Sequence, residues 1–105
     1  MEIKRKRSER PDVISAEETL NVTSAYGKDG KESARQERMN VRKFLVEPAY
    51  VRVNAGMTKN MGNYESLRID VSLTVPCYTE EVDRVFPRVA ERVSVFLQEE
   101  LKNYE

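Results

Sequence analysis

Histidine and tryptophan are missing from this 105-residue chain, and it has a single cysteine, Cys77. Without histidine, the chain cannot build a Ser-His-Asp or Cys-His catalytic site, and zinc would find one thiolate and otherwise only carboxylates. Gly-rich phosphate-binding motifs are also missing. We therefore expect a protein without catalytic activity, bound metal or cofactor. Cys77 follows a strand-like run, where a lone cysteine is far more often a small buried apolar residue than a nucleophile.

Long apolar runs are missing too. No stretch approaches the roughly 18 consecutive apolar residues of a membrane span. The first residues are charged and no apolar run follows them, so we expect neither a secretory signal peptide nor contact with a membrane. A single cysteine cannot form an internal disulfide, which favours a reducing, cytoplasmic setting.

Charge is balanced over the whole chain but unevenly spread along it. Residues 1–43 carry 11 basic against 8 acidic side chains, whereas residues 79–105 carry 4 against 7. This distribution predicts two faces of different sign. Such a protein could meet a polyanion at its basic end or pair head to tail with its own copies. A strongly basic nucleic-acid-binding protein would usually show a larger excess.

The composition changes twice along the chain, and we divide it into three parts. Residues 1–12 are typical of a solvated basic arm. Residues 13–40 are interpreted as irregular or locally helical: their beginning fits a short helix or a strand, and the charged run 31–40 fits an exposed helix or a flexible loop. Residues 41–105 are expected to form an α+β core domain.

An antiparallel β-hairpin is the strongest structural prediction. Apolar residues occupy every second position in two segments, with polar residues between them, which indicates strands with one buried and one polar face. The residues 59–63, rich in Gly and Asn, are expected to form the loop between the two strands. The apolar positions are Val51, Val53, Ala55 and Met57 in the first segment and Leu67, Ile69, Val71, Leu73 and Val75 in the second.

A C-terminal amphipathic helix is expected to cover the apolar face of this hairpin or small sheet. Thr79 would cap the helix, and acidic residues follow it where the helix dipole favours them. Pro87 interrupts the pattern, so we expect the helix to be kinked or broken near it. The apolar stripe consists of Val82, Val85, Phe86, Val89, Val93, Phe96 and Leu97.

Two strands and one helix make a thin core, and long strands leave edges that invite pairing. Either the N-terminal part adds a strand or several chains associate. We expect a homo-oligomer.

Three groups of residues are candidates for recognition of nucleic acid. The hairpin loop offers Lys59, Asn60, Asn63 and Tyr64, although its amides could simply satisfy their own backbone. The polar sheet face, with Arg52, Asn54 and Arg68, could bind a single strand or simply be solvated. The arm residues Lys4, Arg5, Lys6 and Arg7 could contact phosphates by releasing counterions, or only keep the chain soluble.

The segments Pro48 to Val53, Gly56 to Ser66, Val75 to Cys77 and Glu80 to Val82 resemble a group of small proteins of uncharacterised activity encoded by phages and prophages. The likeness covers about half of the chain, from Pro48 through the helix. It implies a small accessory factor acting in a bacterial cytoplasm on nucleic acid or on a host protein, and it carries over no functional residues.

Two functions follow as hypotheses. The preferred one is a noncatalytic nucleic-acid-binding accessory protein of phage or mobile-element type, for single strands. The alternative is a protein-interaction module, such as a phage inhibitor of a host protein or an assembly factor, that uses its acidic helix or an open strand edge.

Overall fold

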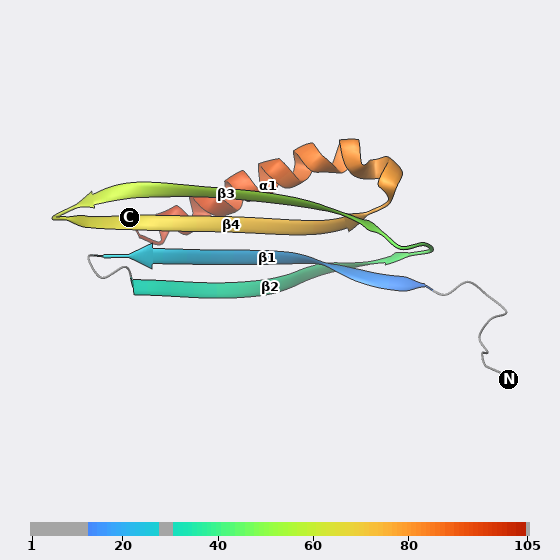
Figure 1. The fold of residues 1–105 in the computed structure, drawn as a ribbon, viewed down its shortest axis with the longest axis horizontal. Helices are drawn as coiled ribbons and strands as arrows, with labels where there is room; N and C mark the ends of the chain where they lie inside the picture. Colours follow the sequence, from blue (N-terminus) through green and yellow to red (C-terminus); the bar gives the residue numbers. More distant parts are fainter. Residues whose placement is uncertain (1–12, 28–30, 105) are drawn as a thin grey trace, which may run out of the picture.

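Four antiparallel strands and one C-terminal helix make up the fold (Figure 1). The computed structural model describes residues 13–27 and 31–104. The elements are β1 (Ile14–Tyr26), β2 (Lys31–Phe44), β3 (Ala49–Gly62), β4 (Glu65–Cys77), the short 3-10 turn η2 (Thr79–Glu81) and α1 (Val82–Lys102). The predicted basic arm, residues 1–12, lies outside the described residues.

The sheet has the strand order β2-β1-β4-β3 and consists of two hairpins, β1–β2 and β3–β4. The hairpins are joined by antiparallel pairing of β1 with β4, from Thr19 opposite Thr74 to Tyr26 opposite Leu67. In β3–β4, Val51 lies opposite Val75. The predicted hairpin and the α+β class are therefore confirmed.

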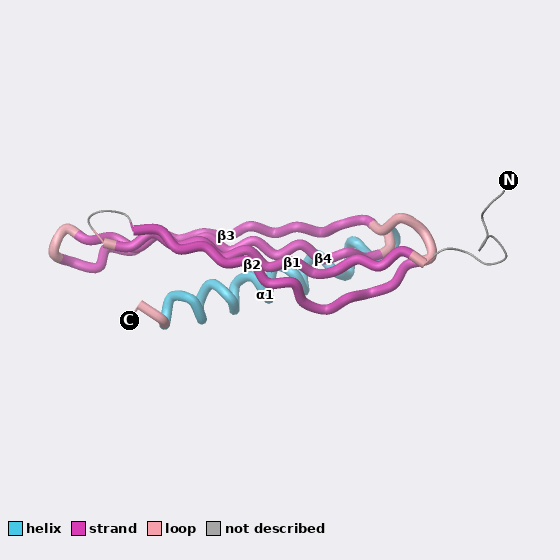
Figure 2. Tube along the Cα trace, turned by 90° about the horizontal axis from the view of Figure 1, so that it is seen from below, coloured by secondary structure: helices cyan, strands magenta, loops and turns pink. Residues whose placement is uncertain are grey.

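Helix and sheet form two layers, with the helix on one face of the sheet and no element of the described residues on the other face (Figure 2). The alternating apolar residues of β4 face the helix and are buried, Leu67, Ile69 and Leu73 completely. Leu20 and Val22 of β1 continue this core, and α1 contributes Val89 and Val93. Burial of such a side chain contributes roughly 1.5–3 kcal/mol, so this interior is the main source of stability.

Where the structure describes them, residues 13–40 are neither irregular nor helical: they form β1, for which a strand was one of the two expected alternatives, and most of β2, for which neither the exposed helix nor the flexible loop is found. Polar residues at helix-facing positions of β1 concealed its alternation. Glu18 there contacts Arg92 of α1 at 3.1 Å, and Ser24 hydrogen-bonds the Tyr104 hydroxyl. The core domain thus begins with β1 and not near Val41.

β2 has almost no alternation of apolar and polar residues, and on both of its faces nearly all side chains are exposed. It is a strand because its backbone pairs with β1, from Ile14 opposite Phe44 to Tyr26 opposite Lys31. Pairing of this kind overrides weak local preference.

The expected break of the helix near Pro87 is wrong, and no kink is shown there: α1 is one continuous helix from Val82 to Lys102. Proline costs this helix one backbone hydrogen bond, which packing of the buried Val89 and Val93 offsets. The capping position also differs, because Thr79 opens η2 and Glu81 directly precedes α1. Of the predicted stripe, only Phe86 is exposed.

Candidate nucleic-acid interface

The uncovered face of the sheet, here called the open face, collects the outward side chains of four strands. The predicted residues Arg52, Asn54 and Arg68 all lie on this face. Arg52 is opposite Thr74, Asn54 is opposite Ser72, and Arg68 of β4 is opposite Thr58. Tyr50 continues the row toward one end of β3 and is 54% exposed. The structure therefore brings Arg52, Asn54 and Arg68 together on one surface.

Two arginines of the open face are held by neighbouring side chains. Arg52 Nε donates to Ser72 Oγ at 3.1 Å. Arg68 makes a two-pronged contact with Asp70, Nε to Oδ2 at 3.0 Å and a terminal nitrogen to Oδ1 at 2.6 Å. The hydrogen bond to Asp70 raises the pKa of Arg68. These contacts hold both guanidinium groups against the sheet.

Gly56 is what allows the Arg68–Asp70 pair to lie flat. It sits opposite Asp70 in the register, and a Cβ placed on it would collide with Asp70 Oδ1 and with the Arg68 guanidinium. Thr58, the next outward residue on β3, accepts a bond from Arg68 at 3.1 Å. The glycine thus provides the space in which the ion pair rests.

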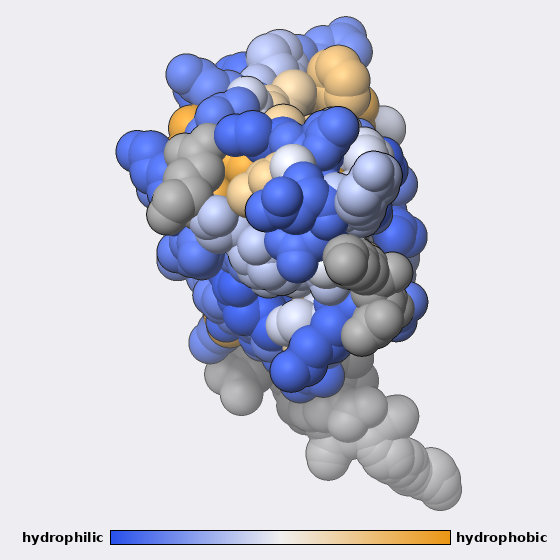
Figure 3. All heavy atoms as spheres, turned by 90° about the vertical axis from the view of Figure 1, so that its left-hand side faces the viewer, coloured by the Kyte–Doolittle hydropathy of each residue, from blue (hydrophilic) through white to orange (hydrophobic). Residues whose placement is uncertain are grey.

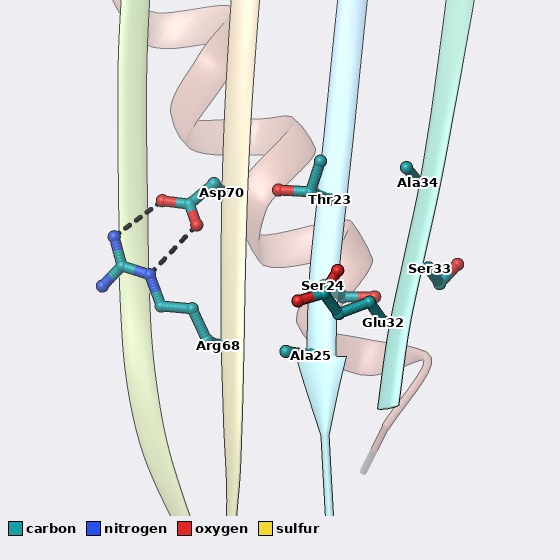
Figure 4. Close-up of a pocket in the computed structure, with 8 residues that line it drawn as sticks. All are labelled: Thr23, Ser24, Ala25, Glu32, Ser33, Ala34, Arg68 and Asp70. Carbon is teal, nitrogen blue, oxygen red and sulfur yellow. Dashed lines mark hydrogen bonds and ion pairs between the residues drawn. The ribbon is translucent and has the colours of Figure 1, made fainter. Parts of the chain in front are cut away.

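Two adjoining hollows lie beside this ion pair, and Figure 4 shows the residues that line the larger one. The larger, about 560 Å³, lies between β2, β1 and β4, and the smaller, about 330 Å³, between β1, β4 and β3. Thr23 and Asp70 line both. Glu32, Ser33 and Arg68 also line the larger hollow, as does Ser24, whose hydroxyl is however bonded to Tyr104 on the helix side. The other polar residues of the smaller hollow are Asn21, Arg52, Asn54 and Ser72.

Sequence reasoning did not assign Asn21 and Thr23 to the site. The polar residues Thr19, Asn21 and Thr23 recur with a period of two, which fits the strand alternative for this segment but did not by itself place the segment beside β4. Asn21 accepts a hydrogen bond from Gln36 of β2 at 2.9 Å, so the polar surface extends over all four strands.

The expected five-residue hairpin loop is wrong, because β3 extends to Gly62 and β4 begins at Glu65. Asn63 and Tyr64 alone form the turn, with φ of 56° and 64°. Positive φ at both central residues is the geometry of a type I′ turn. Gly62, with φ of 85°, donates its N–H to Asn60 Oδ1 at 2.8 Å.

The residues predicted to share one loop therefore lie in different parts of the hairpin. Asn60 lies on the open face opposite Ser66, whereas Lys59 lies opposite Leu67 and is half-buried on the helix side. Tyr64 is 96% exposed at the hairpin tip. Viewed toward this end of the molecule, the surface is mostly hydrophilic (Figure 3). The arm residues Lys4, Arg5, Lys6 and Arg7 lie outside the described residues.

Cys77 is fully buried, and burial raises the pKa of its thiol, which disfavours the nucleophilic thiolate. Within residues 13–27 and 31–104, no group of three acidic or cysteine side chains is placed to hold a metal ion. No helix in the described part of the chain is long and apolar enough to cross a membrane.

Comparison with protein-family models, with curated proteins and with solved structures gave no match.

Proposed function

We propose that the protein is a noncatalytic nucleic-acid-binding accessory protein that binds single strands along its open face. The observation that carries this proposal is the polar face left uncovered by the helix, with Arg52 and Arg68 held against the sheet by Ser72 and Asp70. Guanidinium groups bind phosphates, and the amides and hydroxyls around the two hollows can hydrogen-bond base edges.

Exposed tyrosines mark both ends of this surface. Tyr50 is 54% and Tyr64 is 96% exposed, and a base stacked on an aromatic ring contributes about 1–3 kcal/mol. Between them runs the row of Arg52, Asn54 and Arg68 along β3 and β4. A single strand lying along the sheet would meet a ring, polar groups and a second ring in turn.

Single strands are favoured over duplex by the distribution of charge. The helix that the structure describes belongs to the segment 79–105, which carries 4 basic against 7 acidic residues. An acidic helix is unsuited to the groove of a duplex, where it would lie between two rows of phosphates. Arg68 of the open face is paired with Asp70. We therefore assign most of the phosphate attraction to Lys4, Arg5, Lys6 and Arg7.

The resemblance to phage and prophage proteins supports a phage or mobile-element context, and we propose action in the cytoplasm of a bacterial host. We also propose that the protein works as a homo-oligomer, because β2 is an open strand edge.

The test is fluorescence anisotropy with labelled single- and double-stranded oligonucleotides. Affinity is measured at two salt concentrations about fourfold apart, roughly 50 and 200 mM, so that counterion release becomes visible. We expect salt-dependent binding that prefers single strands. The double variant Arg52→Ala/Arg68→Ala should weaken it, whereas Arg88→Ala, an exposed arginine on α1, should not. A chain that starts at Val13 should show a shallower salt dependence. Absence of binding at the lower salt would refute the proposal.

One observation favours the alternative function, docking onto a host protein. Val13, Leu45 and Val46 are 52%, 63% and 60% exposed. They lie at the end of the sheet where β1 begins and β2 ends, as the pairing of Ile14 with Phe44 shows (Figure 1). Capture of one host protein from a bacterial lysate, insensitive to salt and lost in Leu45→Ser/Val46→Ser, would support this function.

A further inference from the structure

β2 is a strand edge that neither layer of the molecule covers. Every residue from Lys31 to Arg38 is exposed, and β2 pairs with β1 on one side only. The helix packs mainly on the other half of the sheet, against β3 and β4 (Figure 1). An edge of this length presents a row of backbone N–H and C=O groups to any strand that approaches it.

We propose that this edge binds β2 of a second copy of the chain, antiparallel, about a two-fold axis that passes beside Gln36. In this register Gln36 lies opposite Gln36 of the other copy. Regular pairing covers Ala34 to Arg38, with Ser33 and Met39 flanking it, because β2 shifts its register against β1 between Arg38 and Val41. Arg35 of each copy then lies opposite Glu37 of the other, so the contact contains two reciprocal ion pairs. Opposite charges facing each other across strands stabilise a sheet by roughly 0.2–1 kcal/mol per pair.

The neighbouring registers are disfavoured by the same charges. A two-fold axis between antiparallel strands keeps both helices on the same face of the joined sheet. Residues that lie opposite each other must then point to the same face, so the two-fold axis can move only from one residue to the next along β2. One such step places Arg35 opposite Arg35, and although it also places Glu32 opposite Arg38, it brings two arginines face to face at the axis. The step in the other direction places Glu37 opposite Glu37. Both put like charges directly opposite each other, which destabilises the pairing.

Charged side chains on an edge usually protect it against unspecific pairing. Here they also select the partner, because the order Arg35-Gln36-Glu37 is complementary to itself when reversed. Arg35 is held in position by Glu37 at 2.7 Å and by Glu100 of α1 at 2.9 Å. Glu37 of the other copy would therefore approach an Arg35 side chain that is already extended on the helix side of β2.

Pairing at this edge closes on itself, because the same strand serves both copies and is then fully used. It joins two four-stranded sheets into one, with both helices on one side and both open faces on the other. The contact does not depend on the nucleic-acid proposal. If that proposal holds, the joined open faces offer a binding surface twice as long across the strands.

The first test measures association by sedimentation with Glu37→Arg and its matched control Glu99→Arg, an exposed residue of α1 with the same change of charge. Wild type and the control should form dimers. Glu37→Arg puts two arginines opposite each other twice and should raise the dimer dissociation constant at least about tenfold, with unchanged circular dichroism. A monomeric wild type, or a dimer equally stable in Glu37→Arg, would overturn the proposal.

The second test fixes the register by cross-linking. Opposite Cα atoms in antiparallel strands are about 4.5–5.5 Å apart, within disulfide range, so Gln36→Cys should cross-link to itself under mild oxidation. Ser33→Cys lies opposite Met39 in the proposed register and should not. The native Cys77 is fully buried and can stay. Equal cross-linking of both variants would overturn the register.

The association test also separates the two proposals. Arg52→Ala/Arg68→Ala should keep the dimer, since both residues lie away from β2 on β3 and β4. A dimer that binds no oligonucleotide would refute the nucleic-acid function and leave the β2 contact intact.

Discussion

Arg42 at the end of β2 and Glu81 just before α1 form a two-pronged ion pair, with nitrogen–oxygen distances of 3.0 and 3.2 Å. Glu81 also accepts a hydrogen bond from the backbone N–H of Tyr78 at 2.8 Å and forms an ion pair with Arg84. The Arg42 guanidinium lies against the rings of Phe44 and Tyr78, 4.8 and 5.1 Å from their centres. One carboxylate thus connects an edge strand to the start of the helix.

This contact predicts a pH dependence of stability. Hydrogen bonds from Arg42 and from the Tyr78 N–H lower the pKa of Glu81 in the folded protein. The stabilisation is therefore fully present above the unfolded-state pKa and is lost as the pH falls through the lowered folded-state pKa. In urea unfolding between about pH 5 and pH 3, wild type should lose more free energy than Glu81→Gln. Glu80→Gln, an exposed neighbour, should behave like wild type, and parallel curves for all three proteins would contradict the prediction.

The turn at the hairpin tip contains a residue, Tyr64, whose backbone conformation lowers the stability of the fold. Tyr64 has φ of 64°, a region in which a side chain costs roughly 1–2 kcal/mol and glycine nearly none. Tyr64→Gly should therefore raise the free energy of unfolding by about 1 kcal/mol, measured by urea denaturation.

The same substitution tests the role of the exposed ring. Under the proposed function, Tyr64→Gly should weaken single-strand binding while it stabilises the fold, and Tyr64→Phe should retain binding. A more stable variant with unchanged affinity would show that Tyr64 does not contact the oligonucleotide.

Asp70 competes with phosphate for Arg68 on the open face. Asp70→Asn removes one negative charge and weakens the ion pair, so it should tighten single-strand binding. If Arg68 gains one phosphate contact, the slope of log affinity against log salt should steepen by about 0.7. Gly56→Ala should act in the same direction without a change of charge, because its Cβ displaces the pair. Asp83→Asn, an exposed residue of α1, is the control. Anisotropy titrations in which Asp70→Asn and Asp83→Asn behave alike would argue against binding at the open face.

Tyr104, which follows α1, is joined to Ser24 of β1 by a partly buried hydrogen bond. Ser24, 6% exposed, and the Tyr104 hydroxyl lie 2.7 Å apart, and the Tyr104 ring packs on Tyr26. Tyr104→Phe leaves the Ser24 hydroxyl without this partner and should cost about 1–2 kcal/mol.

A double-mutant cycle with Ser24→Ala isolates this bond. The double variant should be less destabilised than the sum of the single variants, with a coupling of about 1 kcal/mol in thermal or urea unfolding. Additive effects would show that the two hydroxyls do not stabilise one another.

The candidate site was only partly predictable. Arg52, Asn54 and Arg68 share a face because strand alternation fixes parity, and parity can be read from sequence. The roles of Gly56 and Asp70 depend on which β3 residue lies opposite which β4 residue. That register follows from a two-residue turn, and the sequence indicated a longer loop.

By itself, the sequence determined the β3–β4 hairpin and the amphipathic helix that covers it. Both carry regular apolar patterns, and burial of apolar surface enforces such patterns locally. Tertiary structure decided the rest. Glu18 and Ser24 face the core side of β1 only because Arg92 and Tyr104 meet them there. β2 is a strand because β1 supplies its hydrogen-bond partners, and a strand exposed on both faces has no apolar alternation from which it could be predicted.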